Sequence, residues 1–307
     1  MNYTLHQLQI FYKIAQLQSV TKASEELHLT QPAVSIQLKN FQDQFPIPLT
    51  EVVGRKLYIT DFGQEIAQAS EKILNEVHAI NYKTLAYQGE LGGKLKISIV
   101  STAKYVMPYF LSDFIRQHPG VELSIDVTNK ARVIESVEAN EIDFALVSVV
   151  PEKLRINRVE LMQNHLYYVA STRLDLPVSA DKRSLFQSIP LIYREQGSAT
   201  RNAMEQFIAQ NQFDVRKKIE LTSNEAVKQA VIAGLGASIM PLIGIKNELR
   251  NNDLQIVPVR GLPISTTWNP IWLQAKKLSP VARAYLEFID ANKEAIIEAK
   301  FKWIGEY

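Results

Sequence analysis

Polar side chains that recur at helical spacing predict binding chemistry in the first part of this sequence. Gln31, Ser35 and Lys39 lie four residues apart, so a helix would carry them on or beside one face. A Gln side chain can form two hydrogen bonds with the edge of an adenine, and Ser and Lys can contact bases or phosphates. This face therefore predicts contact with double-stranded DNA.

The other residues expected to contact DNA surround this face. Ile36 is apolar and β-branched on the solvent side of the helix, where we expect it to touch a thymine methyl group. Arg55 and Lys56 follow Gly54 at a hairpin tip, from which they can reach phosphates or a minor groove. The complete predicted set is Thr21, Lys22, Gln31, Pro32, Ala33, Ser35, Ile36, Lys39, Arg55 and Lys56. A purely structural role for these helices stays open as the alternative, because three short amphipathic helices are common in proteins that bind no DNA.

Loops between expected strands and helices form a second group of polar positions. Ser101-Thr102, Thr128-Asn129 and Gly197-Ser198-Ala199-Thr200-Arg201 each follow a strand and precede a helix. Helix N-termini at the carboxyl ends of strands attract anions. We therefore expect an anionic or carboxylate-bearing small molecule to bind Ser101, Thr102, Thr128, Asn129, Gly197, Ser198, Thr200 and Arg201. Simple helix capping is the alternative at each position.

Catalytic and metal-binding motifs are missing from the sequence. Its five His residues are scattered without metal-ligand spacing, and it has no Cys. No Gly-x-Ser-x-Gly elbow, phosphate loop or dinucleotide fingerprint occurs. We expect no enzyme, no metal and no cofactor. A small-molecule carrier without DNA-binding activity is the other alternative, but it gives no reason for the DNA-contacting pattern within residues 1–60.

Composition indicates a folded cytoplasmic protein. The 307 residues are 46% hydrophobic and 21% charged, enough for about two domains with sizeable cores. No run approaches the roughly 20 apolar residues that cross a bilayer, and we expect no secretory signal. The net charge is only +2, and five basic residues stand against four acidic residues within residues 1–60. DNA binding must therefore come from the placement of charges, and a modest salt dependence is expected.

The elements that position the first group are helical. Leu5, Leu8, Phe11, Tyr12 and Ala15 lie on one face of a first helix, and Lys22–His28 forms a short second helix. Thr30 caps a third helix, with Pro32 in its first turn. The inward positions of this third helix are Val34, Leu38, Phe41 and Phe45. A hairpin of residues 49–53 and 57–60 follows.

A long helix is predicted from Asp61, with Asp61 as its cap. Its apolar or neutral positions step by three and four residues, which is typical of a two-stranded coiled coil. Packing on its own domain is the alternative. The positions expected to pair are Ile66, Ala69, Ile73, Val77 and Ile80, and the same stepping continues to Thr84 and Tyr87.

Gly89, Gly92 and Gly93 mark a junction, after which strands and helices alternate. Strands are expected at 95–100, 121–127, 142–149, 166–170, 189–193, 217–221, 237–240 and 267–274. Helices are expected at 105–117, 131–140, 198–209, 224–233 and 280–292. Helical crossovers of this length imply parallel sheets, and two such series predict two α/β lobes with a crevice between them.

One continuous stretch closely resembles the signature of LysR-type transcriptional regulators: Ser19-Val20-Thr21-Lys22-Ala23-Ser24-Glu25-Glu26-Leu27-His28-Leu29-Thr30-Gln31-Pro32-Ala33-Val34-Ser35. The chain also keeps Pro48-Leu49, Gly54-Arg55, Ile59-Thr60 and Gly63 where that family has them. It departs from the family at Pro46, Thr50 and Val52, where Gly, Phe and a cation are usual. A cation at Val52 would supply one phosphate contact.

The resemblance extends to the end of the chain and implies an α/β protein with an all-α-dominated N-terminal winged helix-turn-helix. The implied C-terminal domain is two-lobed and periplasmic-binding-protein-like. The expected domains are residues 1–60 for DNA, 61–88 for a dimerising linker helix and 89–307 for the effector. Within the last, lobe I covers about 92–161 and 267–307, and lobe II about 162–266.

The implied function is sequence-specific regulation of transcription, controlled by a small and anionic metabolite bound between the lobes. The implied partners are an operator with dyad symmetry, a second copy of the chain in a homodimer or a homotetramer built from two dimers, and RNA polymerase as a candidate. No membrane partner is expected. Residues 223–236 look like the corresponding segment of regulators of carbon dioxide fixation and nitrogen assimilation genes.

Overall fold

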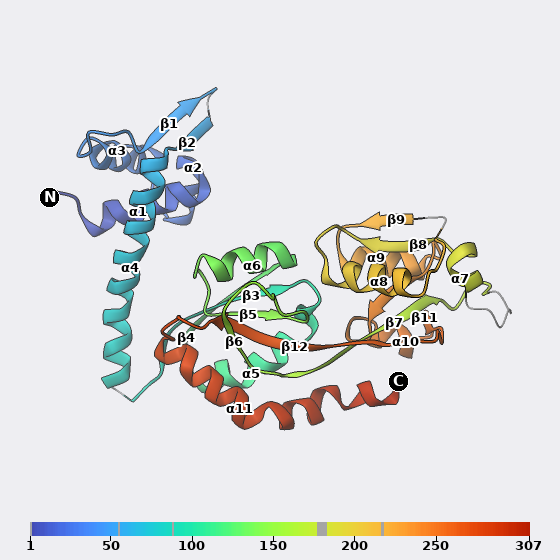
Figure 1. The fold of residues 1–307 in the computed structure, drawn as a ribbon. Helices are drawn as coiled ribbons and strands as arrows, with labels where there is room; N and C mark the ends of the chain where they lie inside the picture. Colours follow the sequence, from blue (N-terminus) through green and yellow to red (C-terminus); the bar gives the residue numbers. More distant parts are fainter. Residues whose placement is uncertain (1, 55, 88, 177–182, 216–217) are drawn as a thin grey trace. The chain divides into compact units, whose positions relative to one another are not determined.

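A computed structural model describes residues 2–54, 56–87, 89–176, 183–215 and 218–307 of the chain (Figure 1). The chain divides into two compact units, Met1–Gly93 and Lys94–Tyr307. Helices dominate the first unit, and alternating strands and helices build the second. The predicted fold class, a helical N-terminal winged helix-turn-helix followed by a two-lobed α/β domain, is confirmed.

The first unit is a three-helix cluster followed by a hairpin and a long helix. Its elements are α1 (Leu5–Leu17), α2 (Val20–Glu26), α3 (Gln31–Gln42), β1 (Thr50–Val53), β2 (Lys56–Ile59) and α4 (Asp61–Tyr87). Strands β1 and β2 are antiparallel, with Thr50 opposite Ile59 and Val53 opposite Lys56. The hairpin projects from the cluster as a wing (Figure 1).

Hydrogen-bonding side chains fix where the first three helices begin. The Thr4 side chain accepts from the Gln7 amide, and the Gln7 side chain accepts from the Thr4 amide, which forms a capping box. Thr30 caps α3 as predicted, accepting from the Ala33 amide. The predicted start of the second helix was wrong. The Ser19 hydroxyl accepts from the Lys22 amide, so α2 begins at Val20 rather than at Lys22.

Two adjoining apolar clusters hold this unit together. Phe11 of α1 and Phe41 of α3 are fully buried with their ring centroids 5.2 Å apart. Val34 of α3 is also fully buried and packs with Ile10 and Ile14 of α1. Burial of one such side chain stabilises a fold by about 1.5–3 kcal/mol. The inward face of α3 is therefore the predicted one.

Helix α4 begins with a different cap from the predicted Asp61. The Thr60 hydroxyl accepts from the Gly63 amide at 2.9 Å and donates to the Pro48 carbonyl at 2.7 Å, so Thr60 ties the helix start to the base of the wing. Gly63 must lack a side chain there, because a Cβ atom would lie 2.1 Å from the carbonyl oxygen of Leu49. The orientation of the wing relative to α4 is thus fixed by backbone contacts.

In the second unit, the described residues form one eight-stranded sheet and one two-stranded sheet. Its strands are β3 (Gly92–Val100), β4 (Gly120–Thr128), β5 (Phe144–Val147), β6 (Ile156–Arg158), β7 (Met162–Ser171), β8 (Leu191–Arg194), β9 (Lys218–Leu221), β10 (Ser238–Pro241), β11 (Leu254–Ile256) and β12 (Ile264–Leu273). Its helices are η1 (Ala103–Tyr105), α5 (Met107–Gln117), α6 (Lys130–Glu138), α7 (Arg183–Ser188), α8 (Ala199–Gln210), α9 (Asn224–Ile232), η2 (Leu242–Gly244), α10 (Lys246–Arg250), α11 (Pro280–Phe301) and η3 (Lys302–Glu306).

The expectation of parallel sheets is only partly met. Strand β3 is parallel to β5, and β8 is parallel to β9. Strand β12, in contrast, is antiparallel to β5, β6 and β7, and β10 and β11 are antiparallel to β7. The difference arises because β7 and β12 connect one lobe to the other, which the alternation of strands and helices did not reveal.

Strand β12 changes partners midway and so forms the connection between the lobes. Residues Ile264–Trp268 pair with β7, and Asn269–Leu273 pair with β5 and β6. Figure 1 shows β7 and β12 running side by side from one lobe to the other. A change in lobe separation must therefore act on these two strands.

The C-terminal helix is longer than predicted and reaches both lobes. Helix α11 extends to Phe301 instead of residue 292, and at its start Tyr285 packs against Phe114 and Phe144 in lobe I. Trp303, just beyond it, is buried among lobe II residues that include Val169 and Ile192. The last residues of the predicted lobe I range, about 267–307, thus include apolar side chains after Phe301 that pack on the other lobe.

Candidate nucleic-acid interface and effector cleft

Helix α3 presents one polar face to solvent. Most of the predicted DNA-contacting residues are exposed, and Ser35 is half-buried. The exposed residues of the predicted set are Thr21, Lys22, Gln31, Pro32, Ala33, Ile36, Lys39 and Lys56. Arg55 lies outside the described residues. Val34 and Phe41 on the opposite face of the helix are fully buried. The exposed face is therefore not needed for packing within this unit.

Two side chains on this face are already arranged relative to each other. The amide nitrogen of Gln31 donates to the hydroxyl of Ser35 at 2.9 Å. Gln31 keeps its second amide hydrogen and its carbonyl oxygen, the donor and the acceptor that an adenine edge requires. Ile36, next to this pair, is 58% exposed. It supplies an apolar contact surface beside a polar one.

The wing carries apolar side chains near its tip. Val52 and Val53 are 68% and 59% exposed, and Lys56 at the start of β2 is exposed. Gly54 has a φ of +57°, a conformation that glycine adopts without strain. The wing can thus offer both an apolar edge and a cation to a groove.

The predicted pairing seam of α4 divides into two parts. Near the start of the helix, Ile66 packs partly into its own unit. Further on, Ala69 and Ile73 are exposed, Val77 is half-buried and Ile80 is 61% exposed. Thr84 and Tyr87 belong to a stretch whose side chains lie outside the described structure. An exposed Ile on a 27-residue helix with polar neighbours is the pattern that a second helix covers in a coiled coil.

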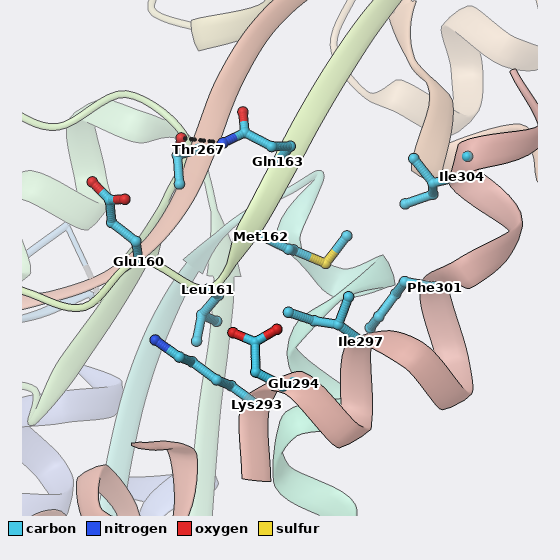
Figure 2. Close-up of a pocket in the computed structure, with 11 residues that line it drawn as sticks. Glu160, Leu161, Met162, Gln163, Thr267, Lys293, Glu294, Ile297, Phe301 and Ile304 are labelled. Atoms are coloured by element: carbon cyan, nitrogen blue, oxygen red, sulfur yellow. Dashed lines mark hydrogen bonds between the residues drawn. The ribbon is translucent and has the colours of Figure 1, made fainter. Parts of the chain in front are cut away.

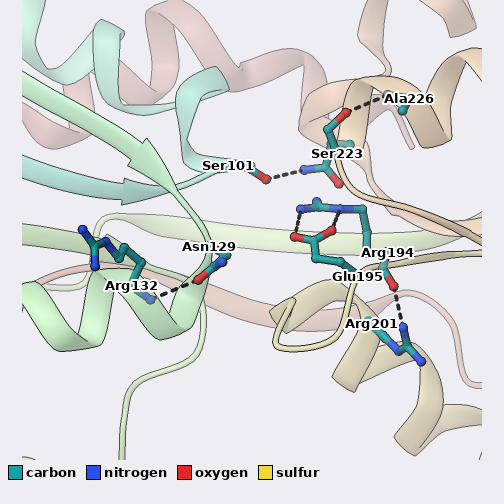
Figure 3. Close-up of polar contacts among 9 residues, drawn as sticks. Ser101, Asn129, Arg132, Arg194, Glu195, Arg201, Ser223 and Ala226 are labelled. Atoms are coloured by element: carbon teal, nitrogen blue, oxygen red, sulfur yellow. Dashed lines mark hydrogen bonds and ion pairs between the residues drawn. The ribbon is translucent and has the colours of Figure 1, made fainter. Parts of the chain in front are cut away.

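In the second unit, residues from both lobes line one narrow cleft (Figure 3). The cleft is partly open to solvent, and a water-sized sphere finds about 20 Å³ of space in it, roughly the room of one water molecule. Five of the predicted effector-binding residues meet there: Ser101, Thr102, Asn129, Ser198 and Thr200. The loops that follow β3, β4 and β8 therefore converge.

Three predicted residues do not line this cleft. Thr128 and Gly197 lie next to lining residues in the chain, and Gly197 has a φ of +83°, so its role in the loop is conformational. Arg201 is engaged elsewhere. Its guanidinium contacts Glu205 at 2.8 Å and Glu220 at 2.7 Å, and it also donates to the carbonyl of Arg194 at 2.9 Å.

The helix starts at the cleft differ in whether a side chain caps them. Asn129 caps α6 by accepting from the Arg132 amide at 3.0 Å, so capping accounts for it. Ser198 stands at the cap position of α8 but makes no capping bond, and its side chain is almost buried. The first-turn amides of α8 therefore remain available to an anion from the cleft.

Three charged residues also line the cleft and are absent from the predicted set: Lys130, Arg194 and Glu195. Arg194 is only 6% exposed, and its Nε and Nη2 atoms donate to the two carboxylate oxygens of Glu195, each at 2.7 Å. The same signal that identified the other loops, polar residues directly after a strand, applies to Arg194. Arg194 is the last residue of β8, three residues before the predicted loop begins at Gly197.

Contacts next to the cleft join the two lobes. The Asn224 amide donates to the Ser101 hydroxyl at 3.5 Å, and the Tyr105 hydroxyl donates to Glu225 at 3.4 Å. Glu225 also binds Lys228, which contacts Glu248 at 2.7 Å. Burial works against the charged form of Lys228, but its carboxylate partners outweigh burial and raise the pKa of its ammonium group.

A second cavity, of about 510 Å³, lies between α11 and the connecting strands (Figure 2). Leu161, Met162 and Phe301 form part of its apolar lining, and Lys293 stands beside Glu294. Although it is larger than the cleft, it contains none of the predicted effector-binding residues. The cleft is therefore the better candidate for an anionic ligand.

Within the described part of the chain, no helix is long and apolar enough to cross a membrane. The same residues contain no group of three or more His, Asp or Glu side chains placed to hold a metal ion.

Family comparisons match both units. Residues 5–64 match the family described as "Bacterial regulatory helix-turn-helix protein, lysR family", and residues 88–293 match "LysR substrate binding domain". The chain belongs to the LysR family of transcriptional regulators. The polar face of α3 and the cleft are thus parts of a DNA-binding regulator with an effector-binding domain.

Relatives within the LysR family match over almost the whole chain. The "HTH-type transcriptional activator CmpR" of Synechocystis sp. is 38% identical over 297 residues, covering 96% of this chain and 97% of that protein. A "RuBisCO operon transcriptional regulator" of Acidithiobacillus ferrooxidans is 36% identical, covering 94% of each. The predicted resemblance to the carbon-fixation branch of the LysR family is confirmed.

Solved LysR-family structures share the architecture. The regulatory domain of Synechocystis CcmR in complex with 2-PG is 32% identical, with a TM-score of 0.61, covering 66% of this chain and 98% of that one. Full-length CbnR complexed with its target DNA is 18% identical, with a TM-score of 0.69, covering 95% of this chain and all of that one. The second likeness concerns the fold alone.

Proposed function

We propose that this LysR-family protein controls carbon-assimilation genes in the cytoplasm and responds to a small anionic metabolite of the 2-phosphoglycolate class. The observation that carries this proposal is the cleft. Arg194, Lys130 and the uncapped start of α8 offer positive charge and donors, and Ser101, Thr102 and Thr200 add hydroxyl groups. Phosphate and carboxylate groups match such donors. The CcmR complex with 2-PG, at 32% identity, supports the same ligand class.

For DNA, we propose that α3 enters the major groove and that the wing contacts the adjoining phosphate backbone. Gln31, Ser35, Ile36 and Lys39 would face the bases or phosphates, and Lys56 and Arg55, the latter outside the described residues, would act from the wing. Thr21 and Lys22 of α2, and Pro32 and Ala33 in the first turn of α3, would lie against the duplex. Exposure of the described members of this set, opposite a well-packed face, supports the assignment.

We further propose that residues 61–88 pair two copies of the chain, so that two copies of residues 1–60 read a site with dyad symmetry. One copy of residues 1–60, with its small positive charge, buries too little surface for tight and specific binding on its own. Residues 89–307 would then form the effector-binding domain. Nothing in the cleft calls for catalysis, and we assign the protein no enzymatic activity.

An electrophoretic mobility shift with the chain's own upstream promoter region tests the proposal, with and without 2-phosphoglycolate. We expect a specific complex whose stability changes with millimolar or lower 2-phosphoglycolate and not with equal concentrations of neutral or aromatic compounds. Isothermal titration of the full-length protein measures the ligand directly. Binding of neutral ligands alone, or of promoter and random DNA with equal affinity, would contradict the proposal.

A further inference from the structure

Arg194 and Glu195 are consecutive residues whose side chains pair in the cleft (Figure 3). Successive side chains of an extended strand point to opposite faces, so neighbours rarely meet. Here β8 ends at Arg194, and Glu195 opens a turn that the Ser198 amide closes by donating to the Glu195 carbonyl at 3.3 Å. Gly197, with its φ of +83°, completes this turn. The turn therefore holds the Glu195 carboxylate against its neighbour.

The pair uses the edge of Arg194 that recognises anions. Both hydrogen bonds are 2.7 Å long and run from Nε and Nη2 to separate carboxylate oxygens. This is the two-pronged geometry with which arginine binds a carboxylate or a phosphate. Glu195 thus offers Arg194 the same group that an anionic metabolite would bring.

The backbone of Arg194 is held in place independently of this pair. Arg201 donates to the Arg194 carbonyl at 2.9 Å while it binds Glu205 and Glu220. Arg194 itself is 6% exposed, whereas the Glu195 side chain is 19% exposed. Of the two partners, Glu195 is therefore the one that can leave, and it can turn toward water as it does so.

We infer that Glu195 is a built-in competitor of the anionic effector: its carboxylate occupies Arg194 until a metabolite anion displaces it. The inference rests on the proposed function, because it concerns the same cleft. Displacement is supported by the geometry of the pair, since Glu195 already fills the edge of Arg194 that an anionic ligand would use. The competitor sets the metabolite concentration at which the regulator responds.

Competition has a quantitative signature. A tethered competitor lowers the apparent affinity of every ligand that needs Arg194 by the same factor, the fraction of molecules in which Arg194 is free. Mere repulsion by a nearby carboxylate would instead weaken a ligand in proportion to its charge. Removal of the Glu195 charge therefore separates the two mechanisms.

The experiment is isothermal titration of the full-length protein and of Glu195→Gln with glycolate, inorganic phosphate and 2-phosphoglycolate. We expect Glu195→Gln to bind each anion about tenfold more tightly, roughly 1.4 kcal/mol, with similar factors for all three. Glu195→Ala repeats the measurement without the amide, which can still accept one bond from Arg194. Glu205→Gln is the matched control, because Glu205 pairs with Arg201 outside the cleft lining, and it should bind as the parent does.

The outcomes are distinct. Unchanged affinity in Glu195→Gln and Glu195→Ala, while the parent binds 2-phosphoglycolate, overturns the competitor and leaves the proposed function intact. A gain that rises with the charge of the ligand also overturns it, in favour of repulsion. If neither the parent nor a variant with native circular dichroism binds any of the three anions, the proposed function fails as well.

Discussion

The hydroxyl of Tyr105 donates across 3.4 Å to Oε2 of Glu225 and so joins lobe I to lobe II. The ring of Tyr105 lies against Gly244 of lobe II, where an added Cβ would come within 3.0 Å of the ring carbon Cε2. Burial raises the pKa of Tyr105, so the phenol stays protonated and remains a donor at neutral pH. This hydrogen bond therefore links the two lobes directly.

Tyr105→Phe removes this inter-lobe hydrogen bond and keeps the ring. We expect the free energy of unfolding of the effector-binding domain to fall by about 0.5–1.5 kcal/mol. Urea unfolding followed by tryptophan fluorescence measures it selectively, because all three tryptophans, Trp268, Trp272 and Trp303, lie in that unit. Tyr109→Phe, at an exposed tyrosine on lobe I, is the control. Equal effects of the two substitutions would refute the role of the Tyr105 hydroxyl.

Lys228 stabilises the same region through charge. Its side chain is 10% exposed between Glu225 and Glu248. Lys228→Met leaves both carboxylates without their cation and should lower the free energy of unfolding at pH 7 by about 3 kcal/mol, the low end for a buried ion pair, because Glu225 is 47% exposed. Lys302→Met, at an exposed lysine paired with Glu298, is the control and should cause no measurable change. A loss no larger than the control's would show that the network is dispensable.

The Lys228 network also predicts how stability depends on pH. Burial works against the charged form of Glu225, but hydrogen bonds with Gln229 and Lys228 outweigh it and hold the pKa below its ordinary value of 4.5. Because the folded pKa is depressed, the stabilisation by Glu225 is present above pH 4.5 and is lost as the pH falls through the folded pKa. We expect Lys228→Met to flatten this acid-side slope in urea titrations. An unchanged slope would contradict the assignment.

Local signals in the sequence predicted the first unit well, because its features depend on neighbouring residues. The Thr30 cap and the inward position of Phe41 follow from residue type and helical spacing. The start of α4 was misassigned because two cap-type residues, Thr60 and Asp61, stand together. Only the contact of the Thr60 hydroxyl with Pro48, twelve residues away, decides between them.

Long-range pairing explains what the sequence did not reveal about the second unit. Nothing local indicates that Asn269 of β12 lies opposite Val147 while Trp268 lies opposite Met162, so the antiparallel connection between lobes was missed. Five of the predicted effector-binding positions line the cleft, whereas Arg201 lies outside its lining. Its partners Glu205 and Glu220 lie four and nineteen residues away, and only the fold brings Glu220 close.

Pairing of two chains through α4 depends on its exposed apolar positions. Ile73 is 41% exposed, and burial of such a side chain in an interface contributes about 1.5–3 kcal/mol. Since the substitution occurs in both chains, Ile73→Glu should raise the dimer dissociation constant at least about a hundredfold. Sedimentation equilibrium measures it. Asn75→Glu, exposed on the same helix outside the seam, is the control. A dimer unaffected by Ile73→Glu would place the interface elsewhere.

Ile36 should determine one base of the operator. If its exposed side chain contacts a thymine methyl group, Ile36→Ala should reduce discrimination at that single position by about 1 kcal/mol and leave the other positions unchanged. Lys39→Ala removes a cation from the same helix and should weaken binding to all sequences alike. Binding of both variants to a library of single-base operator substitutions distinguishes these patterns. A uniform loss in Ile36→Ala would point to packing rather than recognition.

Val52 stands where LysR-type regulators usually carry a cation, and it is 68% exposed on the wing. Val52→Arg should add one phosphate contact per protomer. The logarithm of the affinity should then fall more steeply with the logarithm of salt concentration, by about 0.9 per contact and about 1.8 per dimer. Val52→Gln controls for polarity without charge and should leave the slope unchanged. No increase in Val52→Arg would show that the wing lies away from the phosphate backbone.

For the parent protein we expect no more than about eight released ions per dimer, because its wing and helices carry few cations. A steeper parent slope would show more phosphate contacts than these few cations predict.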